Sequence, residues 1–168
     1  SSLSNRVIAS RTVSDNLGSV KSETSKGWVS NENINSLTVE KEYDIKGRNI
    51  ATTKPNSTEK VLKTYYQDPL NRVKEIKLPT TGSITPTTTL IYNSNTSSEQ
   101  FTSFDSYLAG TLHKVVSNDP NGKQTIEYTN SIGETIASLI DMDKSGTKTS
   151  GDLITEFGYD TFGNIATI

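Results

Sequence analysis

Apolar and polar residues alternate with a period of two over much of this chain, which is typical of β-strands that bury one face. Leu37, Val39 and Tyr43 share one parity just before a polar turn. Phe157 and Tyr159 share one parity before a second such turn, near the C-terminal end. This alternation predicts an all-β fold.

A short polar element separates the predicted strands: Asp or Asn, followed three residues later by Gly. Asp or Asn at the first position of a type I turn caps the turn amides with its side chain, and Gly suits the fourth position. The strongest copies are residues 43–48 (Tyr-Asp-Ile-Lys-Gly-Arg) and 159–164 (Tyr-Asp-Thr-Phe-Gly-Asn). The predicted turn residues are Tyr43, Asp44, Gly47, Arg48, Asp68, Asp119, Gly122, Asn130, Gly133, Tyr159, Asp160 and Gly163.

The spacing of these elements predicts an antiparallel meander. The Asp or Asn residues at positions 119, 130, 143 and 160 are separated by 11, 13 and 17 residues, each about one strand plus one turn. Successive turns should therefore lie on opposite edges of one sheet. Gly, Pro and Asn residues supply the intervening breaks in the first half of the chain.

The regularity of the pattern differs along the chain. Residues 37–168 form the predicted repeat array, with an irregular insert at about 83–116, where the gap from an aspartate to the next glycine is longer. Residues 1–36 are a degenerate lead-in. They are rich in Ser, Asn and Thr and poor in aromatic residues, so both strands and disorder fit them.

Composition agrees with an exposed β array. Hydrophobic residues make up 31% of the chain, and 60 of its 168 residues are Ser, Thr or Asn, which suits strands and turns wetted on both faces. The net charge is -2 with scattered Lys and Arg, which argues against a nucleic-acid partner. The absence of Cys excludes disulfides and zinc–cysteine sites. No apolar run approaches the length of a membrane span.

Residues 43–50 resemble the signature of the RHS/YD-repeat family, Tyr-Asp-x-x-Gly-Arg followed by an apolar residue. Residues 157–165 match the longer form of that signature, with an aromatic residue two positions before the tyrosine. Residues 119–128 resemble the companion turn of such arrays. Other copies are degenerate, with Asn71 in place of Gly and Glu134 in place of Arg.

The resemblance implies a long antiparallel sheet that spirals into a hollow β-shell. Such shells occur in bacterial polymorphic toxins, toxin-complex components and wall-associated surface proteins. The implied location is secreted or at the bacterial cell surface. The implied partners are the rest of the array, an enclosed C-terminal effector, and secretion machinery or a cell-surface ligand. A chain of 168 residues is too short to close a shell, so we expect a segment of a larger protein.

Three kinds of function compete. The first is a structural segment of a β-shell that encapsulates and helps deliver a C-terminal toxin or effector. The alternative is a surface adhesin or binding module that recognises a glycan or a protein. An enzyme is the third, and no catalytic residues are predicted. His113 is the only histidine, and neither a cysteine nor a Gly-x-Ser-x-Gly element supplies a nucleophile.

Residues 141–152 have the spacing of a calcium loop. Oxygen-bearing side chains fall at positions 1, 3, 5, 9 and 12, with Gly at position 6, as in an EF-hand. The candidate ligands are Asp141, Asp143, Ser145 and Asp152. The alternative is a polar hairpin turn, which is favoured by a lysine at the usually apolar position and by the lack of flanking helical patterns. Any calcium bound here should be weak and structural, and no other cofactor is predicted.

Trp28, Tyr65 and Tyr66 form the candidate binding surface. Aromatic rings can stack on sugars or peptides, although in strand arrays they more often pack against cross-strand neighbours. Tyr65 and Tyr66 are adjacent, so they should point to opposite faces of the sheet, one of them toward solvent or a lumen.

Overall fold

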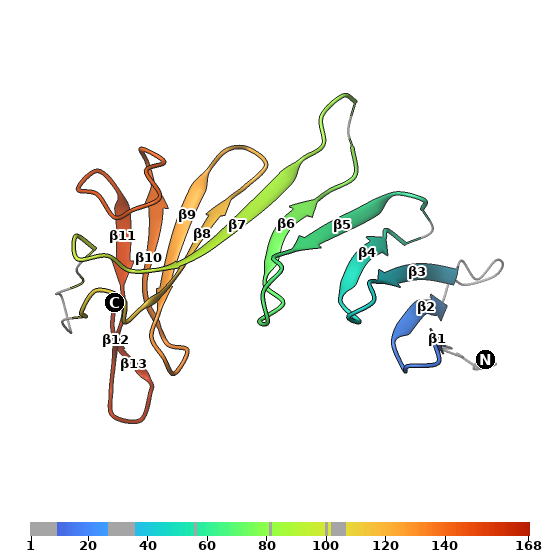
Figure 1. The fold of residues 1–168 in the computed structure, drawn as a ribbon, viewed down its shortest axis with the longest axis horizontal. Helices are drawn as coiled ribbons and strands as arrows, with labels where there is room; N and C mark the ends of the chain where they lie inside the picture. The colour runs from blue at the N-terminus through green and yellow to red at the C-terminus, as the bar shows by residue number, and fades with distance from the viewer. Residues whose placement is uncertain (1–9, 27–35, 56, 81, 100, 102–106) are drawn as a thin grey trace, which may run out of the picture. The chain divides into compact units, whose positions relative to one another are not determined.

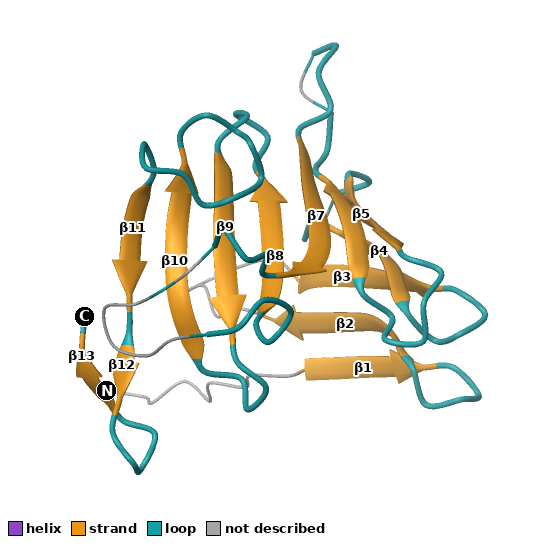
Figure 2. Ribbon diagram, turned by 60° about the vertical axis from the view of Figure 1, so that its left-hand side comes forward, coloured by secondary structure: helices purple, strands orange, loops and turns teal. Residues whose placement is uncertain are grey.

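A computed structural model describes residues 10–26, 36–55, 57–80, 82–99, 101 and 107–168 of the chain. Strands and turns make up these residues (Figures 1 and 2), so the prediction of an all-β fold is confirmed. Trp28 lies outside the described residues. No helix among the described residues is long and apolar enough to cross a membrane.

The strands follow the order predicted for a meander. From β1 to β11 their order in the sheet is their order in the chain, and β12 pairs with β13 as a separate hairpin. The strands are β1 (Ser10–Ser14), β2 (Val20–Lys26), β3 (Ser36–Tyr43), β4 (Asn49–Thr53), β5 (Lys60–Tyr65), β6 (Val73–Lys77), β7 (Thr87–Ser94), β8 (His113–Asn118), β9 (Gln124–Thr129), β10 (Thr135–Asp141), β11 (Leu153–Glu156), β12 (Gly158–Tyr159) and β13 (Ile165–Thr167).

The chain divides into two compact units, Ser1–Pro86 and Thr87–Ile168, which we call the N-unit and the C-unit. The N-unit contains β1 to β6, and the C-unit contains β7 to β13. Within each unit, strands that are neighbours in a sheet pair antiparallel, for example β3 with β4 and β9 with β10. The predicted antiparallel meander is thus confirmed.

The N-unit buries few side chains. Strand β5 alternates between exposed and half-buried positions, with Leu62 on the exposed side. Among the described side chains of this unit, those of Ala51 and Thr53 are buried. Cross-strand polar contacts add to the backbone ladder, such as the Lys41–Glu23 ion pair at 3.0 Å. The low apolar content of the chain therefore corresponds to a sheet held mainly by its backbone hydrogen bonds.

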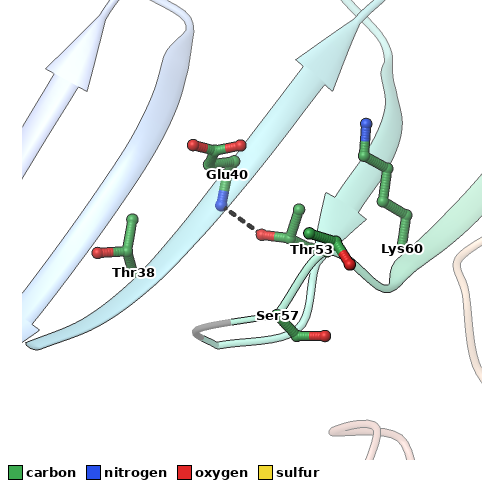
Figure 3. Close-up of a pocket in the computed structure, with 6 residues that line it drawn as sticks. Thr38, Glu40, Thr53, Ser57 and Lys60 are labelled. Atoms are coloured by element: carbon green, nitrogen blue, oxygen red, sulfur yellow. Dashed lines mark hydrogen bonds between the residues drawn. The ribbon is translucent and has the colours of Figure 1, made fainter. Parts of the chain in front are cut away.

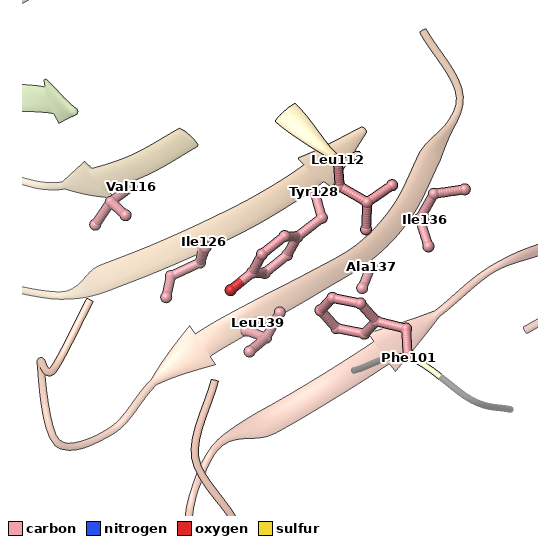
Figure 4. Close-up of a cluster of buried hydrophobic side chains, with 8 residues drawn as sticks. All are labelled: Phe101, Leu112, Val116, Ile126, Tyr128, Ile136, Ala137 and Leu139. Carbon is pink, nitrogen blue, oxygen red and sulfur yellow. The ribbon is translucent and has the colours of Figure 1, made fainter. Parts of the chain in front are cut away.

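The C-unit has a hydrophobic core on one face of β8, β9 and β10 (Figure 4). Cross-strand register places Val116, Ile126 and Leu139 in one row across these strands. The Tyr128 side chain lies in the next row, opposite Ala137. The core residues are Phe101, Leu112, Val116, Ile126, Tyr128, Ile136, Ala137 and Leu139.

The segment expected as an irregular insert, 83–116, contains β7 and the start of β8, and its irregular part is the connection 95–112. This connection supplies Phe101 and Leu112 to the core. The Phe101 and Tyr128 rings lie 4.6 Å apart between centroids and are tilted by 58° (Figure 4), a favourable aromatic geometry. The described residues Phe101 and Leu112 of this connection are therefore packed into the C-unit core.

Replacing a core residue should destabilise the chain far more than replacing an exposed residue of a nearby strand. Ile126 is fully buried, so Ile126→Ala should lower the free energy of unfolding by about 2–5 kcal/mol through lost burial and a cavity. Leu153 is 62% exposed, so Leu153→Ala should change it by less than about 0.5 kcal/mol. Urea denaturation followed by circular dichroism measures both, and equal effects would contradict the assigned core.

Candidate functional site

Among the described residues, five turns share one hydrogen-bond scheme, which the turn at Asp44 illustrates. A sixth turn, at Asp68, keeps part of it, because the Arg72 carbonyl there accepts from the Tyr66 N–H. The Gly47 N–H donates to the Asp44 carbonyl, and the Asp44 N–H donates to the Arg48 carbonyl, both at 3.0 Å. Asp44 Oδ1 accepts from the N–H groups of Lys46 and Arg48 at 2.9 and 3.0 Å. Gly47 has a φ of 75°, a conformation in which glycine lacks the steric cost of a side chain. The aspartate thus satisfies amides that the sheet edge leaves without a backbone partner.

The scheme recurs in both units. Gly N–H to Asp or Asn carbonyl distances are 3.0–3.1 Å in the turns that begin at Asp15, Asp44, Asp119, Asn130 and Asp160. In the sixth turn Asn71 replaces glycine and adopts a φ of 54°, which asparagine tolerates better than most residues. Its N–H lies 3.4 Å from the Asp68 carbonyl, a weaker bond than in the glycine turns.

The element at Asp143 folds differently. Asp143 Oδ1 accepts from the Ser145 N–H at 2.9 Å, but the Gly146 N–H donates to Asp141 Oδ2 at 2.7 Å. Lys144 and Gly146 both have positive φ angles, of 56° and 71°. Local spacing alone predicted a repeat turn here, and the competing carboxylate of Asp141 explains the difference.

Arg48 ties its own turn to the next hairpin. Its Nε and Nη2 atoms contact Asp44 Oδ2 at 2.7 and 2.6 Å. Its guanidinium carbon lies 4.7 Å from the centre of the Tyr65 ring, and its Nη1 donates to the Tyr66 carbonyl at 3.4 Å. The Tyr65 hydroxyl donates back to the Asn49 carbonyl at 2.8 Å. Successive hairpins of the N-unit are therefore linked by side chains as well as by the ladder.

The C-unit keeps part of this link without the arginine. The Asn130 amide donates to Glu134 Oε2 at 2.6 Å, which reverses the donor and acceptor roles of the Asp–Arg pair. The Tyr159 hydroxyl donates to the Thr135 carbonyl at 2.9 Å. Thr135 and Asn49 each lie five residues after the first residue of their turn, so the tyrosine–carbonyl link recurs in both units.

A buried ionic cluster, which the sequence analysis missed, holds the 95–112 connection to the sheet. Glu99 Oε1 contacts Lys114 Nζ and accepts from the Tyr128 hydroxyl at 2.5 Å. Glu99 Oε2 accepts from the Thr96 N–H at 2.7 Å. Burial raises the pKa of Glu99, but its hydrogen bonds from Lys114, Tyr128 and Thr96 outweigh burial and hold that pKa below its ordinary value. Glu99 is therefore charged at neutral pH, opposite a buried lysine.

The acidic loop between β10 and β11 brings three of the four calcium candidates together. Carboxylate oxygens of Asp141, Asp143 and Asp152 lie within 4.8 Å of one another. The Met142 and Thr149 N–H groups donate to Asp152 at 3.0 and 2.6 Å and orient its carboxylate. The fourth candidate is Ser145. Its hydroxyl donates to the Thr147 carbonyl at 2.9 Å and is not one of the grouped oxygen atoms.

The electrostatics of the acidic loop suit a cation. Burial raises the pKa of Asp141, and the neighbouring Asp143 and Asp152 carboxylates raise it further. Hydrogen bonds from Gly146 and Ser145 lower this pKa, but they do not offset the rise. Hydrogen bonds from Ser145 hold the pKa of Asp143 below its ordinary value. Three carboxylates offer up to six oxygens, and Ca²⁺ takes six to eight. The donor set of Asp141, Asp143 and Asp152 therefore fits a hard divalent cation.

The other candidate side chains either contact neighbouring residues or are exposed to solvent. Tyr65 and Tyr66 are both half-buried; Lys74 Nζ lies 5.9 Å from the centre of the Tyr66 ring. His113 is exposed at the start of β8. Asn95, the first residue of an Asn-x-Ser/Thr sequence, is 2% exposed and bonds through its side chain to Leu108 and Leu112, which leaves no room for a glycan.

A polar groove of about 590 Å³ lies in the N-unit (Figure 3). Among its lining residues, Thr53 Oγ1 accepts a hydrogen bond from the Glu40 N–H at 2.7 Å. Hydroxyl groups and two opposite charges make up the rest of the wall. The lining residues are Thr38, Glu40, Thr53, Ser57, Thr58 and Lys60.

No model of a known protein family matches this chain, and no curated protein matches it. The case for a function therefore depends on the residues and geometry described above.

Removing Arg48 should raise the pKa of Asp44. Burial raises this pKa, but the bonds from Arg48 and Lys46 outweigh burial and lower it. A carboxylate with a lowered pKa stabilises the fold at neutral pH, and that contribution is lost as the pH falls below about 4. In Arg48→Ala the contribution should be smaller, and its loss should be complete at a higher pH. Carboxyl NMR titration measures the shift.

Asp160 is the matched control, because Asn164 stands where the Asp44 turn has arginine, and hydrogen bonds from Asn164 lower the Asp160 pKa. Its pKa should be the same in Arg48→Ala and in the unaltered chain. An unchanged Asp44 pKa in the variant would contradict the described link.

Proposed function

We propose that this chain is a structural segment of a β-shell of the RHS/YD-repeat type, which covers and helps deliver a C-terminal effector. The observation that carries the proposal is the repeated turn. One hydrogen-bond scheme recurs in five described turns and partly in a sixth, and Arg48, Tyr65 and Tyr159 link successive hairpins. Repetition of one linked unit extends a sheet without a new core for each strand.

The exposure of side chains in the N-unit supports a role in a wall. Its described side chains are mostly exposed or half-buried on both faces, so the sheet requires no second layer packed against it. Its turns satisfy their own amides and can meet solvent or a neighbouring segment. Covering a cargo requires area and stiffness rather than a convergent set of reactive groups.

Electron cryomicroscopy of the natural polypeptide that contains these residues tests the proposal. We expect a hollow particle with this segment in its wall and with density for other parts of the polypeptide inside. A segment that stands outside any particle, as a separate module, would contradict encapsulation.

The alternative is a module that recognises a glycan or a protein, and the groove in Figure 3 is the observation that favours it. Its hydroxyl lining can exchange hydrogen bonds with sugar hydroxyls. A glycan array with the chain and with Thr58→Val and Lys60→Ala variants separates the two functions. Binding that both variants remove would favour the module, and absence of binding would favour the wall.

We also propose a structural calcium ion in the acidic loop, held by Asp141, Asp143 and Asp152. Calcium would offset the repulsion among three carboxylates within 4.8 Å and fix the β10–β11 connection. The proton competes with the ion at Asp141, whose pKa is raised, so calcium affinity should weaken at a higher pH than at an ordinary aspartate site.

Calcium should raise the melting temperature of the chain by about 2–5 °C at a concentration tenfold above its dissociation constant. Asp152→Asn should remove this increase, because it deletes one charged ligand. Asp119→Asn is the matched control, since Asn130 shows that asparagine serves at this turn position. Equal responses of Asp152→Asn and the unaltered chain to calcium would refute the site.

A further inference from the structure

Among the described residues, one Lys–Glu pair is shielded from solvent, whereas the others are exposed or half-buried. The side chains of Lys114 and Glu99 are 3% and 0% exposed, and Glu99 Oε1 contacts Lys114 Nζ. In the Lys60–Glu42 pair the corresponding values are 41% and 53%. Burial of two charges is costly, so the neutral forms of lysine and glutamate compete best with the charged forms at the Lys114–Glu99 pair.

Both oxygens of the Glu99 carboxyl group are held by hydrogen-bond donors. Oε1 accepts from the Tyr128 hydroxyl at 2.5 Å and from the Lys148 N–H at 3.3 Å. Oε2 accepts from the Thr96 N–H at 2.7 Å and from the Thr96 hydroxyl at 3.0 Å. Donors fixed on a carboxyl group stabilise the negative charge that develops on its oxygen during attack at the carbon. The carboxyl carbon of Glu99 is thus placed as an electrophile.

The amine of Lys114 is the nucleophile beside this carbon. Oε1 is bonded directly to Cδ, so the contact with Oε1 keeps Nζ next to the atom that it would attack. Strand register fixes Lys114 in β8 opposite Tyr128 in β9. Two reactive groups that a fold holds together react as if at very high concentration. Lysine acts as a nucleophile in proteins where an apolar environment disfavours its charge.

Side chains of the core cover the pair. The Phe101 ring is 1% exposed and packs on Tyr128 with 4.6 Å between ring centres (Figure 4). Lys148 Nζ lies 4.4 Å from the centre of the Phe101 ring. Exclusion of bulk water favours an amide over a separate acid and amine. A polar groove of about 650 Å³, which Lys114 lines, gives a released water molecule a way out.

We propose that Lys114 and Glu99 join through an amide bond between Nζ and Cδ, with the release of one water molecule. A proton first passes from Nζ to Oε1, which leaves a neutral amine and a neutral acid. Nζ then attacks Cδ, and an electron pair of the carbonyl moves to Oε2, where the Thr96 donors stabilise it. Oε1 takes a second proton from the nitrogen and leaves as water while the carbonyl reforms. The protons of the lysine ammonium group thus end on one amide N–H and one water.

The amide closes a ring between two residues that are 15 positions apart in the chain. The chain has no cysteine, so this cross-link is of a kind that reducing conditions do not break. Like a disulfide, it restricts the unfolded chain and thereby stabilises the fold. The cross-link goes beyond the proposed wall function and does not depend on it.

Mass spectrometry of the intact, denatured chain tests the proposal. After several days in the folded state, the unaltered chain should be lighter than its sequence mass by one water, about 18 Da. Trypsin does not cut after an acylated lysine, and Lys114 is the only Lys or Arg between positions 78 and 122. Residues 78–123 should therefore remain in one peptide. An unaltered chain at its full sequence mass would overturn the proposal.

Lys114→Arg removes the nucleophile and keeps the positive charge, so this variant should have its full sequence mass. Lys60→Arg is the matched control, because it makes the same change at the exposed Lys60–Glu42 pair. It should lose one water like the unaltered chain. A loss of water that persists in Lys114→Arg would refute the assignment to this lysine.

Glu99→Gln separates a failure to react from a failure to fold. Ammonia replaces water as the leaving group, so the variant should lose about 17 Da and reach the same final mass as the unaltered chain. Its digest should contain the same 78–123 peptide. Circular dichroism reports whether the variant is folded, and a folded Glu99→Gln chain that keeps its full mass would contradict the proposal.

Discussion

The side-chain oxygen that opens each turn is the interaction on which this structure depends. A tight connection at a sheet edge exposes backbone amides that have no ladder partner, and each unpaired amide carries a cost. At Asp44, one carboxylate oxygen accepts from two such amides, and the same arrangement recurs in five other turns. Each hairpin is thereby closed on itself. The side chain at the tip takes no part in these hydrogen bonds, so the tip can be apolar, as at Ile45, or polar, as at Asn121.

The two units meet the need for stability in different ways. The C-unit has a packed core and a buried contact between Glu99 and Lys114, whereas Ala51 and Thr53 are the buried side chains described in the N-unit. A buried ion pair loses in desolvation much of what it gains in attraction, so its main effect is to fix geometry. Here Glu99 contacts Lys114 and Tyr128, and the Phe101 ring packs on the same tyrosine. The N-unit relies instead on backbone pairing and on the links through Arg48.

Local features of this structure could be predicted from the sequence, and distant ones could not. The turns depend on five consecutive residues, so spacing located them, including the one where Asn71 replaces glycine. The same reasoning failed at Asp143, because Asp141 stands two residues earlier and takes the amide that would close the turn. The grouping of Asp141, Asp143 and Asp152 could be predicted because they lie in one loop of twelve residues.

The contacts between hairpins were beyond the sequence pattern. Arg48 and Tyr65 are 17 residues apart, and their contact depends on register between strands. Glu99 and Lys114 are 15 residues apart, and their contact likewise depends on the tertiary fold. One signal was present: Lys114 has the same parity as Leu112 and Val116, so a lysine on the buried face should have indicated a buried partner.

Amide hydrogen exchange at the turns tests the central claim most directly. The amides of Lys46 and Arg48, and those at the matching positions of the other turns, should exchange at least about tenfold more slowly than free peptide amides, because the opening aspartate or asparagine accepts from them. Protection at all six turns would establish the repeat as one physical unit. Exchange at free-peptide rates at these positions, with the strands still protected, would show that the turns are not held by their side chains and would contradict the account.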